Sequence, residues 1–381
     1  MAATSVVEPI VHLKPSADRF YRPELDCLRF FAFLAVFVHH SFSGDATYYT
    51  AHHIPFGVLI ASAVSAGRFG VDLFFLLSAF LITELLLREQ ERFGKVDLGS
   101  FYARRILRIW PLYFLGILIA VVLPWIDSQQ YFPVRYGAAF VFMLGNWIGI
   151  LGLPVHSVMW SLWSVSFEEQ FYLLWPAFIS RARRETVLLI AAATLFLAAT
   201  IGRQVLLVHA RALHSELAIF TCSVTRLDPI ALGIATAVLL RRRQPSFGVI
   251  SRAVLLVAGL ALWMAAGYDY KLSRGFMLLG YPAVTLGAWF IFLSNFGFPF
   301  APRILRYLGK ISYGLYVFHL LALYWAFKLF GGQLHTLRRF VLFWILSLSL
   351  TLAMAALSYR FFESPFLRLK ERFARVKSRP V

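Results

Sequence analysis

Apolar and polar residues alternate in long blocks along this chain. Most apolar blocks are long enough, or nearly so, to cross a bilayer as helices of about 20 residues. They span roughly 28–43, 69–87, 108–127, 136–153, 163–180, 186–208, 218–240, 249–268, 275–297, 311–331 and 338–361. The pattern predicts an all-α, polytopic bundle of membrane helices.

Basic residues in the short connections predict the orientation of these helices. Loops rich in Arg or Lys stay in the cytoplasm. Four such loops are Arg88 to Arg108, Arg181 to Arg184, Arg241 to Arg243 and Arg303 to Lys310. We therefore place both termini in the cytoplasm, although Arg338 and Arg339 then lie outside.

The region from 136 to 180 does not fit a simple count of crossings. If the first three blocks each cross once, the chain is outside after Trp125 and inside again at Arg181. Residues 136–180 must then cross an odd number of times, although they hold two apolar stretches. One stretch is re-entrant, or the pair forms one broken crossing, which gives about ten membrane helices. Broken segments at membrane depth line cavities, so we expect site residues within 146–172.

Composition supports a membrane protein and narrows its partners. The 381 residues are 60% hydrophobic and 15% charged, with a mean hydropathy of +0.70, which is too little charge for a soluble protein. The net charge of +18 fits basic loops and attraction to anionic lipid. Because little soluble surface remains, we expect no nucleic-acid partner. Cys27 and Cys222 fit neither a disulfide framework nor a metal site.

The chain divides into one large membrane domain and two tails. Residues 1–24 carry several charges and lack the apolar core of a cleavable signal, so we expect the first membrane helix to act as the targeting signal. We predict a cytoplasmic tail at 1–21, a transmembrane domain at 22–367 and a basic cytoplasmic tail at 368–381.

Arg29 and His40 lie within one apolar run. Ionisable residues in a membrane helix are costly and usually face the bundle interior as functional groups. Eleven residues at about 100° each return to within about 20° of the same helix face, and they rise about 16 Å. We therefore expect Arg29 and His40 to line one chamber. His39 points about 80° away from that face.

Asp72 and three arginines lie at opposite ends of the next two helices. Asp72 either caps a helix start or approaches His40, where a carboxylate would fix the imidazole tautomer and raise its basicity. Arg104, Arg105 and Arg108 gather at the cytoplasmic rim. They either set the orientation of the helix or grip an anionic cytosolic ligand such as the phosphates of coenzyme A.

Other embedded polar residues have both structural and functional interpretations. Glu168, beside Glu169, is a helix-start anion or a site acid, and we favour a site role for one of the two. Arg226 and Asp228 either neutralise each other as an ion pair or belong to a site. A lone His319 two turns into its helix is typically a hydrogen-bonded packing residue.

Seven motifs in order resemble the acyltransferase 3 family of membrane O-acyltransferases, over about residues 22 to 367. Ala79 and the pair His39-His40 depart from the pattern, which usually has Gly and a single His. The motifs are Arg29 to His40, Val71 to Ser78, Arg104 to Pro111, Trp163 to Tyr172, Arg226 to Asp228, Ile311 to His319 and Tyr359 to Pro365.

The resemblance implies transfer of an acyl group, most often acetyl, from cytosolic acyl-CoA to a hydroxyl of an extracytoplasmic or membrane-bound sugar; some family members acylate small natural products. It implies a multi-pass protein of the bacterial inner membrane, with no permanently bound cofactor and no metal. The donor would dock at Arg104, Arg105 and Arg108. Several acceptors fit equally, among them lipopolysaccharide, exopolysaccharide, peptidoglycan, a lipid-linked glycan and a secondary metabolite.

The family likeness also gives roles to individual residues. His40 would act as general base on the acceptor hydroxyl, with an acyl-imidazole as a variant. Asp72 or Glu168 would orient the imidazole, and Arg29 would contact the donor or stabilise charge on the thioester oxygen. Further site candidates are Tyr172, Arg226, Asp228 and His319.

Two other classes of function also explain charges inside a membrane. A transporter or flippase of an anionic or sugar-bearing substrate would use embedded charges and a broken helix. A receptor or scaffold would need Arg29 and His40 for assembly. Binding of coenzyme A separates the enzyme from the transporter, because transport needs no acyl donor.

Overall fold

The computed structural model describes residues 20–151, 157–182, 184–212, 216–242, 244–268, 273–331 and 336–376. These residues form helices and no β-strand, which confirms the predicted all-α class. Residues 1–19 and 377–381 of the two predicted tails lie outside the described residues, as does Arg243 of the third basic loop.

The helices follow one another with short connections. The first part of the chain contains α1 (Pro23–Ser41), α2 (Ala46–Ala51), α3 (Gly57–Ala66), η1 (Gly67–Phe69), α4 (Gly70–Phe93), α5 (Leu98–Ile126), α6 (Val134–Val141), η2 (Gly145–Trp147), α7 (Leu162–Ile179) and α8 (Glu185–Ala212). The second part contains α9 (Glu216–Thr221), η3 (Val224–Arg226), α10 (Leu227–Arg242), α11 (Val249–Tyr268), η4 (Phe276–Gly280), α12 (Tyr281–Asn295), α13 (Arg303–Lys310), α14 (Ser312–Leu329), α15 (Leu337–Leu357), η5 (Ser358–Glu363) and α16 (Ser364–Glu371).

Six helices in the described ranges are long and apolar enough to cross a membrane. They are Gly57–Phe93, Leu98–Ile126, Glu185–Val208, Val249–Tyr268, Phe276–Asn295 and Arg338–Glu371. The last is 34 residues long, or about 51 Å at 1.5 Å per residue, whereas the hydrocarbon core is about 30 Å thick. The helix therefore extends well beyond the hydrocarbon. The count of ten crossings and the cytoplasmic termini stay predictions.

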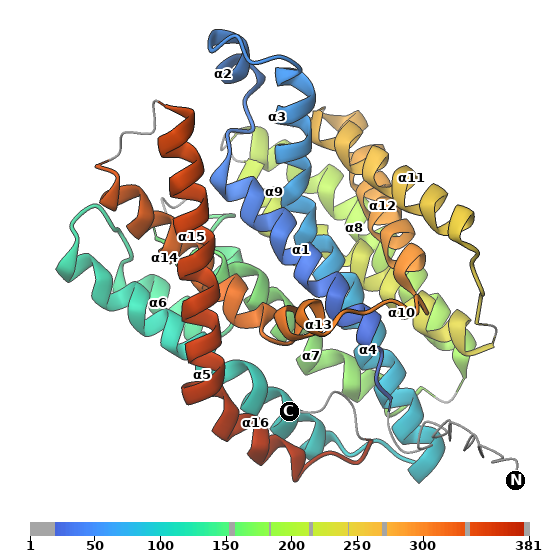
Figure 1. Cartoon of the computed structure of the whole chain (residues 1–381). Coiled ribbons are helices and arrows are strands. Elements are labelled where there is room, and N and C mark those ends of the chain that lie inside the picture. Colours follow the sequence, from blue (N-terminus) through green and yellow to red (C-terminus); the bar gives the residue numbers. More distant parts are fainter. Residues whose placement is uncertain are drawn as a thin grey trace, which may run out of the picture.

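Helix α1 lies in the middle of the bundle, between α15 on one side and α11 and α12 on the other (Figure 1). Helix α16 lies at the lower end of that view and α2 at the upper end. Two glycines bring α4 against α1: a Cβ at Gly67 would lie 2.3 Å from the carbonyl oxygen of Ala35, and one at Gly70 would lie 2.4 Å from that of Ala32. This close approach fixes which faces of α1 remain open.

Two predicted segments differ from the observed helices. The second apolar helix was expected at 69–87, but it continues from Gly57 through Phe93, because the stretch before Gly67 is also apolar. The segment 218–240 was expected to be continuous, but α9 ends at Thr221. The Nδ2 of Asn146 donates to the carbonyl oxygen of Thr221 at 3.1 Å, which satisfies a group that a helix end leaves free.

The region between 136 and 180 is interrupted, as the crossing count predicted. Helix α6 has only eight residues and is followed by the 3₁₀ turn η2, and α7 begins at Leu162. Which of these elements crosses the bilayer stays a prediction. After the interruption, the start of α7 lies against α14, where the Ser164 hydroxyl is 2.7 Å from that of Tyr316, and it lines the central cavity described next.

Candidate functional site

Three cavities follow one another along α1. The basic cavity, of about 130 Å³, lies between α1, α4, α5 and α16. The central cavity, of about 100 Å³, lies between α1, α4, α5, α7 and α14. The histidine cavity, of about 420 Å³, contains His40. The basic and central cavities share Arg29, Ser78, Arg105 and Arg108 as lining residues.

Val71 and Tyr316 line both the central cavity and the histidine cavity, so the two spaces meet at these residues. The Tyr316 hydroxyl lies 2.7 Å from the Ser164 hydroxyl, on the central side, and donates to the carbonyl oxygen of Ser161, on the histidine side, at 3.2 Å. We call these two shared residues, Val71 and Tyr316, the partition between the two spaces.

Arg29 lies on the opposite side of this partition from His40. Its guanidinium forms an ion pair with Asp26, with Nη1 3.3 Å from Oδ1, and Tyr21 donates to the other oxygen of that carboxylate at 3.0 Å. Arg29 lines the basic and central cavities, whereas His40 lines the histidine cavity. The prediction of one chamber shared by the two side chains is therefore wrong: they face adjoining cavities that meet at the partition.

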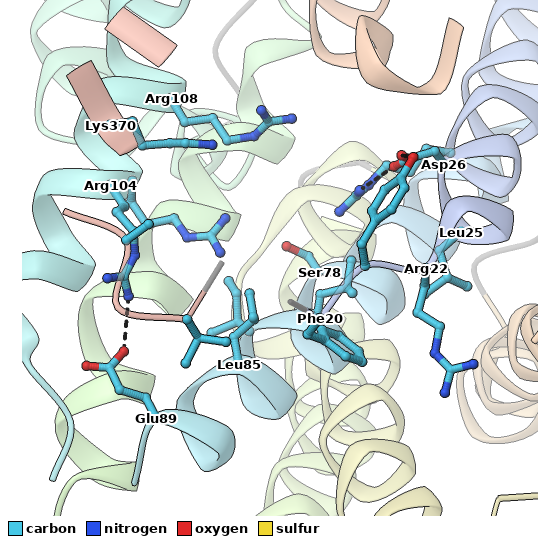
Figure 2. Close-up of a pocket in the computed structure, with 17 residues that line it drawn as sticks. Phe20, Arg22, Leu25, Asp26, Ser78, Leu85, Glu89, Arg104, Arg108 and Lys370 are labelled. Carbon is cyan, nitrogen blue, oxygen red and sulfur yellow. Dashed lines mark hydrogen bonds and ion pairs between the residues drawn. The ribbon is translucent and has the colours of Figure 1, made fainter. Parts of the chain in front are cut away.

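The basic cavity gathers cations without matching anions. Arg104 is paired, since its Nη2 lies 3.3 Å from Oε2 of Glu89. Among the described residues, Arg105, Arg108 and Lys370 have no carboxylate within ion-pair distance. The Arg105 guanidinium instead lies over aromatic rings of Phe101 and Tyr172, 5.4 and 5.2 Å from their centroids. Figure 2 shows Arg108 and Lys370 extending into the same space beside Arg104.

The central cavity carries the predicted acid Glu168. Tyr172 donates its hydroxyl proton to Oε2 of Glu168 at 3.1 Å, and the same hydroxyl contacts the Oγ of Ser78. Glu168 therefore faces the space lined by Arg29 and Arg105, not the histidine cavity. Its neighbour Glu169 points elsewhere and accepts a hydrogen bond from the Trp110 ring at 2.9 Å.

Hydrogen bonds assign the tautomer of His40. Its Nδ1 lies 2.9 Å from the carbonyl oxygen of Val36, and the Nδ1 of His319 lies 2.6 Å from that of Tyr316. A carbonyl can only accept, so both Nδ1 atoms carry protons. His319 Nε2, 3.3 Å from His40 Nδ1, is then an acceptor as well. The remaining nitrogen of His40, Nε2, keeps its lone pair.

His39 lies beside His40, with ring centroids 5.0 Å apart, and lines the same cavity. Its Nδ1 is 3.1 Å from the carbonyl oxygen of Val64 on α3. His40 alone of the two lies against His319, whose side chain is fully buried. Aromatic rings of Trp160, Trp163 and Phe220 complete the walls of this cavity.

Asp72, Arg226 and Asp228 lie outside the cavities just described, in a buried cluster. Arg226 pairs with Asp72, with Nη2 2.6 Å from Oδ2, so the predicted approach of Asp72 to His40 is wrong. Asp228 pairs with Arg203 at 3.1 Å and accepts from the Thr285 hydroxyl at 2.8 Å. Arg226 and Asp228 are thus each neutralised, although by other partners than one another.

Sequence reasoning missed several residues that the fold brings to these sites. Arg203 interrupts the apolar block 186–208, and an arginine there is a signal by itself. Lys370 was assigned only to a basic tail, because nothing in its local sequence indicates a cavity. Tyr316 and Ser78 are ordinary helix residues by pattern. Within the described residues, no group of three His, Cys, Asp or Glu side chains is placed to hold a metal ion.

Comparison with known proteins identifies relatives of nearly the whole chain. The profile of the acyltransferase 3 family, described as an acyltransferase domain, matches residues 22–360. The chain is 26% identical to O-acetyltransferase OatA of Staphylococcus aureus, covering 91% of this chain and 57% of that protein. It is 30% identical to peptidoglycan O-acetyltransferase OatA of Listeria monocytogenes, covering 91% and 56%. The chain thus spans little more than half the length of these relatives. No solved structure matches it.

Proposed function

This chain belongs to the acyltransferase 3 family, and from that premise we propose that it moves an acetyl group from acetyl-CoA to a hydroxyl of a cell-surface or lipid-linked glycan. One observation carries the proposal: the central cavity joins a cavity lined by unpaired cations, with which it shares Arg105 and Arg108, to the cavity that contains His40, which it meets at Val71 and Tyr316. A donor with several phosphates fits the first cavity, and an acceptor hydroxyl fits the second.

The basic cavity supports a phosphate-bearing donor from the cytoplasm. Cations gathered in a partly dehydrated space without a carboxylate are unfavourable unless an anion joins them, and guanidinium groups suit phosphate oxygens. Arg105 and Arg108 line both the basic and the central cavity. The diphosphate would lie beside them, while the thin pantetheine arm would extend past Arg29 into the central cavity and bring the thioester towards Tyr316.

The histidine cavity supports a glycan acceptor. It is the largest of the three, with aromatic walls and the polar side chains of Arg68 and Glu216, a combination of apolar faces and few polar groups typical of ligand sites. The name of the Listeria relative specifies peptidoglycan, and we propose peptidoglycan as the first acceptor to test for this chain.

The hydrogen-bond arrangement supports the following proton transfers. His40 Nε2 takes the proton of the acceptor hydroxyl while that oxygen attacks the thioester carbon. The C–S bond then breaks, and the proton on His40 passes to the departing coenzyme A thiolate. Arg29 stabilises the negative charge that develops on the thioester oxygen. His319 takes the orienting role first expected of Asp72 or Glu168, because its Nε2 lies 3.3 Å from His40 Nδ1.

The test compares adjacent histidines in membranes that contain the protein. Radiolabelled acetyl-CoA is added to the cytoplasmic face, and the label in the glycan fraction is counted and identified by mass spectrometry as one added acetyl group. We expect His40→Ala to abolish transfer at unchanged protein level, and His39→Ala to retain most of it. Transfer that survives in His40→Ala contradicts the general-base role. Wild-type protein that neither binds nor consumes acetyl-CoA contradicts the enzyme and favours a transporter.

A further inference from the structure

Lys370 lies beyond the family match, which ends at residue 360, yet it lines the basic cavity. It is on α16, the short helix that follows the π-helical turn η5. In Figure 2 its side chain runs alongside that of Arg108 towards the open space. The position of Lys370 therefore depends on a segment that the family pattern does not describe.

The surroundings of Lys370 are cationic. Arg104, Arg105 and Arg108 line the same cavity as Lys370, and the exposed Glu371 is next to it in the chain. Two carboxylates line the same cavity, and each already has a cation: Glu89 pairs with Arg104 at 3.3 Å and Asp26 pairs with Arg29 at 3.3 Å. Gathering like charges in a partly dehydrated space is unfavourable, so the arrangement suits a ligand that brings several negative charges.

Contacts with α5 and its N-cap hold α16 and the turn after it in place. The Nη1 of Arg104 donates to the carbonyl oxygen of Phe373 at 2.6 Å, and Arg375 pairs with Asp97, the N-cap of α5, at 2.8 Å. Ala374 and Val376 then form part of the cavity wall. Helix α16 and the residues after it thus form one wall of the basic cavity.

We propose that α16 completes the donor site and that Lys370 binds a phosphate of acyl-CoA together with Arg108. This rests on the proposed function above. Lys370 acts in donor binding and not in the proton transfers, which take place at His40. The Lys370 ammonium is a compact charge with three N–H donors, whereas Arg105 and Arg108 carry planar guanidinium groups. The three side chains together suit a cluster of phosphate oxygens.

The experiment measures acetyl-CoA kinetics for the full-length protein in membranes. Lys370→Gln should raise KM for acetyl-CoA about tenfold, the loss of one charge-assisted hydrogen bond, with kcat nearly unchanged. Arg368→Gln removes one positive charge from an exposed position of the same helix and should leave both constants unchanged. Lys370→Arg keeps the charge and should restore most of the affinity.

A second substrate identifies the phosphate. The KM for 3′-dephospho-acetyl-CoA is compared between wild type and Lys370→Gln. If Lys370 binds the ribose phosphate, the substitution should not raise this KM further. If Lys370 binds the diphosphate, the substitution should raise this KM by the same factor of about ten. Equal KM values for Lys370→Gln and Arg368→Gln overturn the inference. If Arg108→Gln raises KM while Lys370→Gln does not, the donor binds in the basic cavity without a contribution from α16. If wild-type protein does not use acetyl-CoA, the proposed function itself is wrong.

Discussion

Two groups of inward-facing cations in this protein differ in what neutralises them. In the buried cluster, each guanidinium meets a carboxylate: Arg226 with Asp72 at 2.6 Å and Arg203 with Asp228 at 3.1 Å. In the basic cavity, Arg105, Arg108 and Lys370 have no such partner within the described ranges. All four members of the buried cluster have exposed fractions of 0 to 1%, whereas the basic cavity is open.

The difference separates charges that hold the helices together from charges that await a ligand. The pair of Asp72 with Arg226 joins α4 to the turn before α10, and Arg203 of α8 joins Asp228 of α10. Each guanidinium already has a carboxylate partner, so no anionic ligand is needed to neutralise it. An intramembrane arginine therefore points to a ligand site only when the fold leaves it unpaired beside a cavity, which a sequence does not reveal.

The largest expected effect is on stability, in the buried cluster. Asp72→Asn leaves Arg226 as an uncompensated buried charge, which should reduce the free energy of unfolding by about 3–5 kcal/mol. The measurement is the midpoint of thermal unfolding in detergent or nanodiscs. The double variant Asp72→Leu with Arg226→Met should recover much of the loss, since apolar pairs of similar volume often replace buried ion pairs. If Asp72→Asn is as stable as wild type, the charges of the buried cluster do not hold the helices together.

The next effect is on donor binding, in the basic cavity. Arg108→Gln should raise KM for acetyl-CoA about tenfold, or about 1.4 kcal/mol in binding. Its thermal midpoint without ligand should equal or exceed that of wild type, because a repulsive neighbour of Arg105 is removed. The opposite outcome, a large loss of stability at unchanged KM, would show that Arg108 stabilises the fold and does not bind the donor.

A third variant converts a paired cation into an unpaired one. Glu89→Gln frees Arg104 from its carboxylate while the amide oxygen can still accept from the backbone N–H of Asp97, now at 2.8 Å from Oε1. We expect KM for acetyl-CoA to fall about threefold, because the freed Arg104 can form one weak ion pair with the donor. The check is the same kinetic assay, with Glu371→Gln as an exposed control. A rise in KM would show that Arg104 serves the cavity best when it is paired.

The sequence predicted these regions unequally, for physical reasons. Six of the apolar blocks correspond to the helices that are long and apolar enough to cross a membrane, and the clustering of Arg104, Arg105 and Arg108 follows from helix periodicity alone. The interruption between 136 and 180 followed from counting basic loops. These features depend on neighbours in sequence, so local patterns are enough to find them.

The remaining features depend on how helices rotate and cross. Asp72 pairs with Arg226, 154 residues away, and helix phase alone does not choose between that partner and His40. The same holds for the partition, since Tyr316 contacts two cavities only because α14 lies against α7. Lys370 reaches the basic cavity through a π-helical turn and a short helix, a path that no periodicity encodes.

The smallest expected effect tests a third kind of charge, paired but at the helix end. Asp127, just after α5, is bonded to Lys328 and Tyr324 of α14. These bonds lower its pKa to about 2, below the value of about 3.9 for an unfolded chain. The stabilisation is therefore fully present above about pH 4 and is lost as the pH falls through about 2.

Asp127→Asn should lower the thermal midpoint at pH 7 by much less than Asp72→Asn does, because ion pairs that water can reach contribute little. The difference from wild type should shrink between pH 4 and pH 2, since the wild-type carboxylate becomes protonated there and loses its attraction to Lys328. The measurement is the thermal midpoint of wild type and of Asp127→Asn at several pH values between 4 and 2. A difference that stays constant with pH would mean that packing, and not charge, holds α5 to α14.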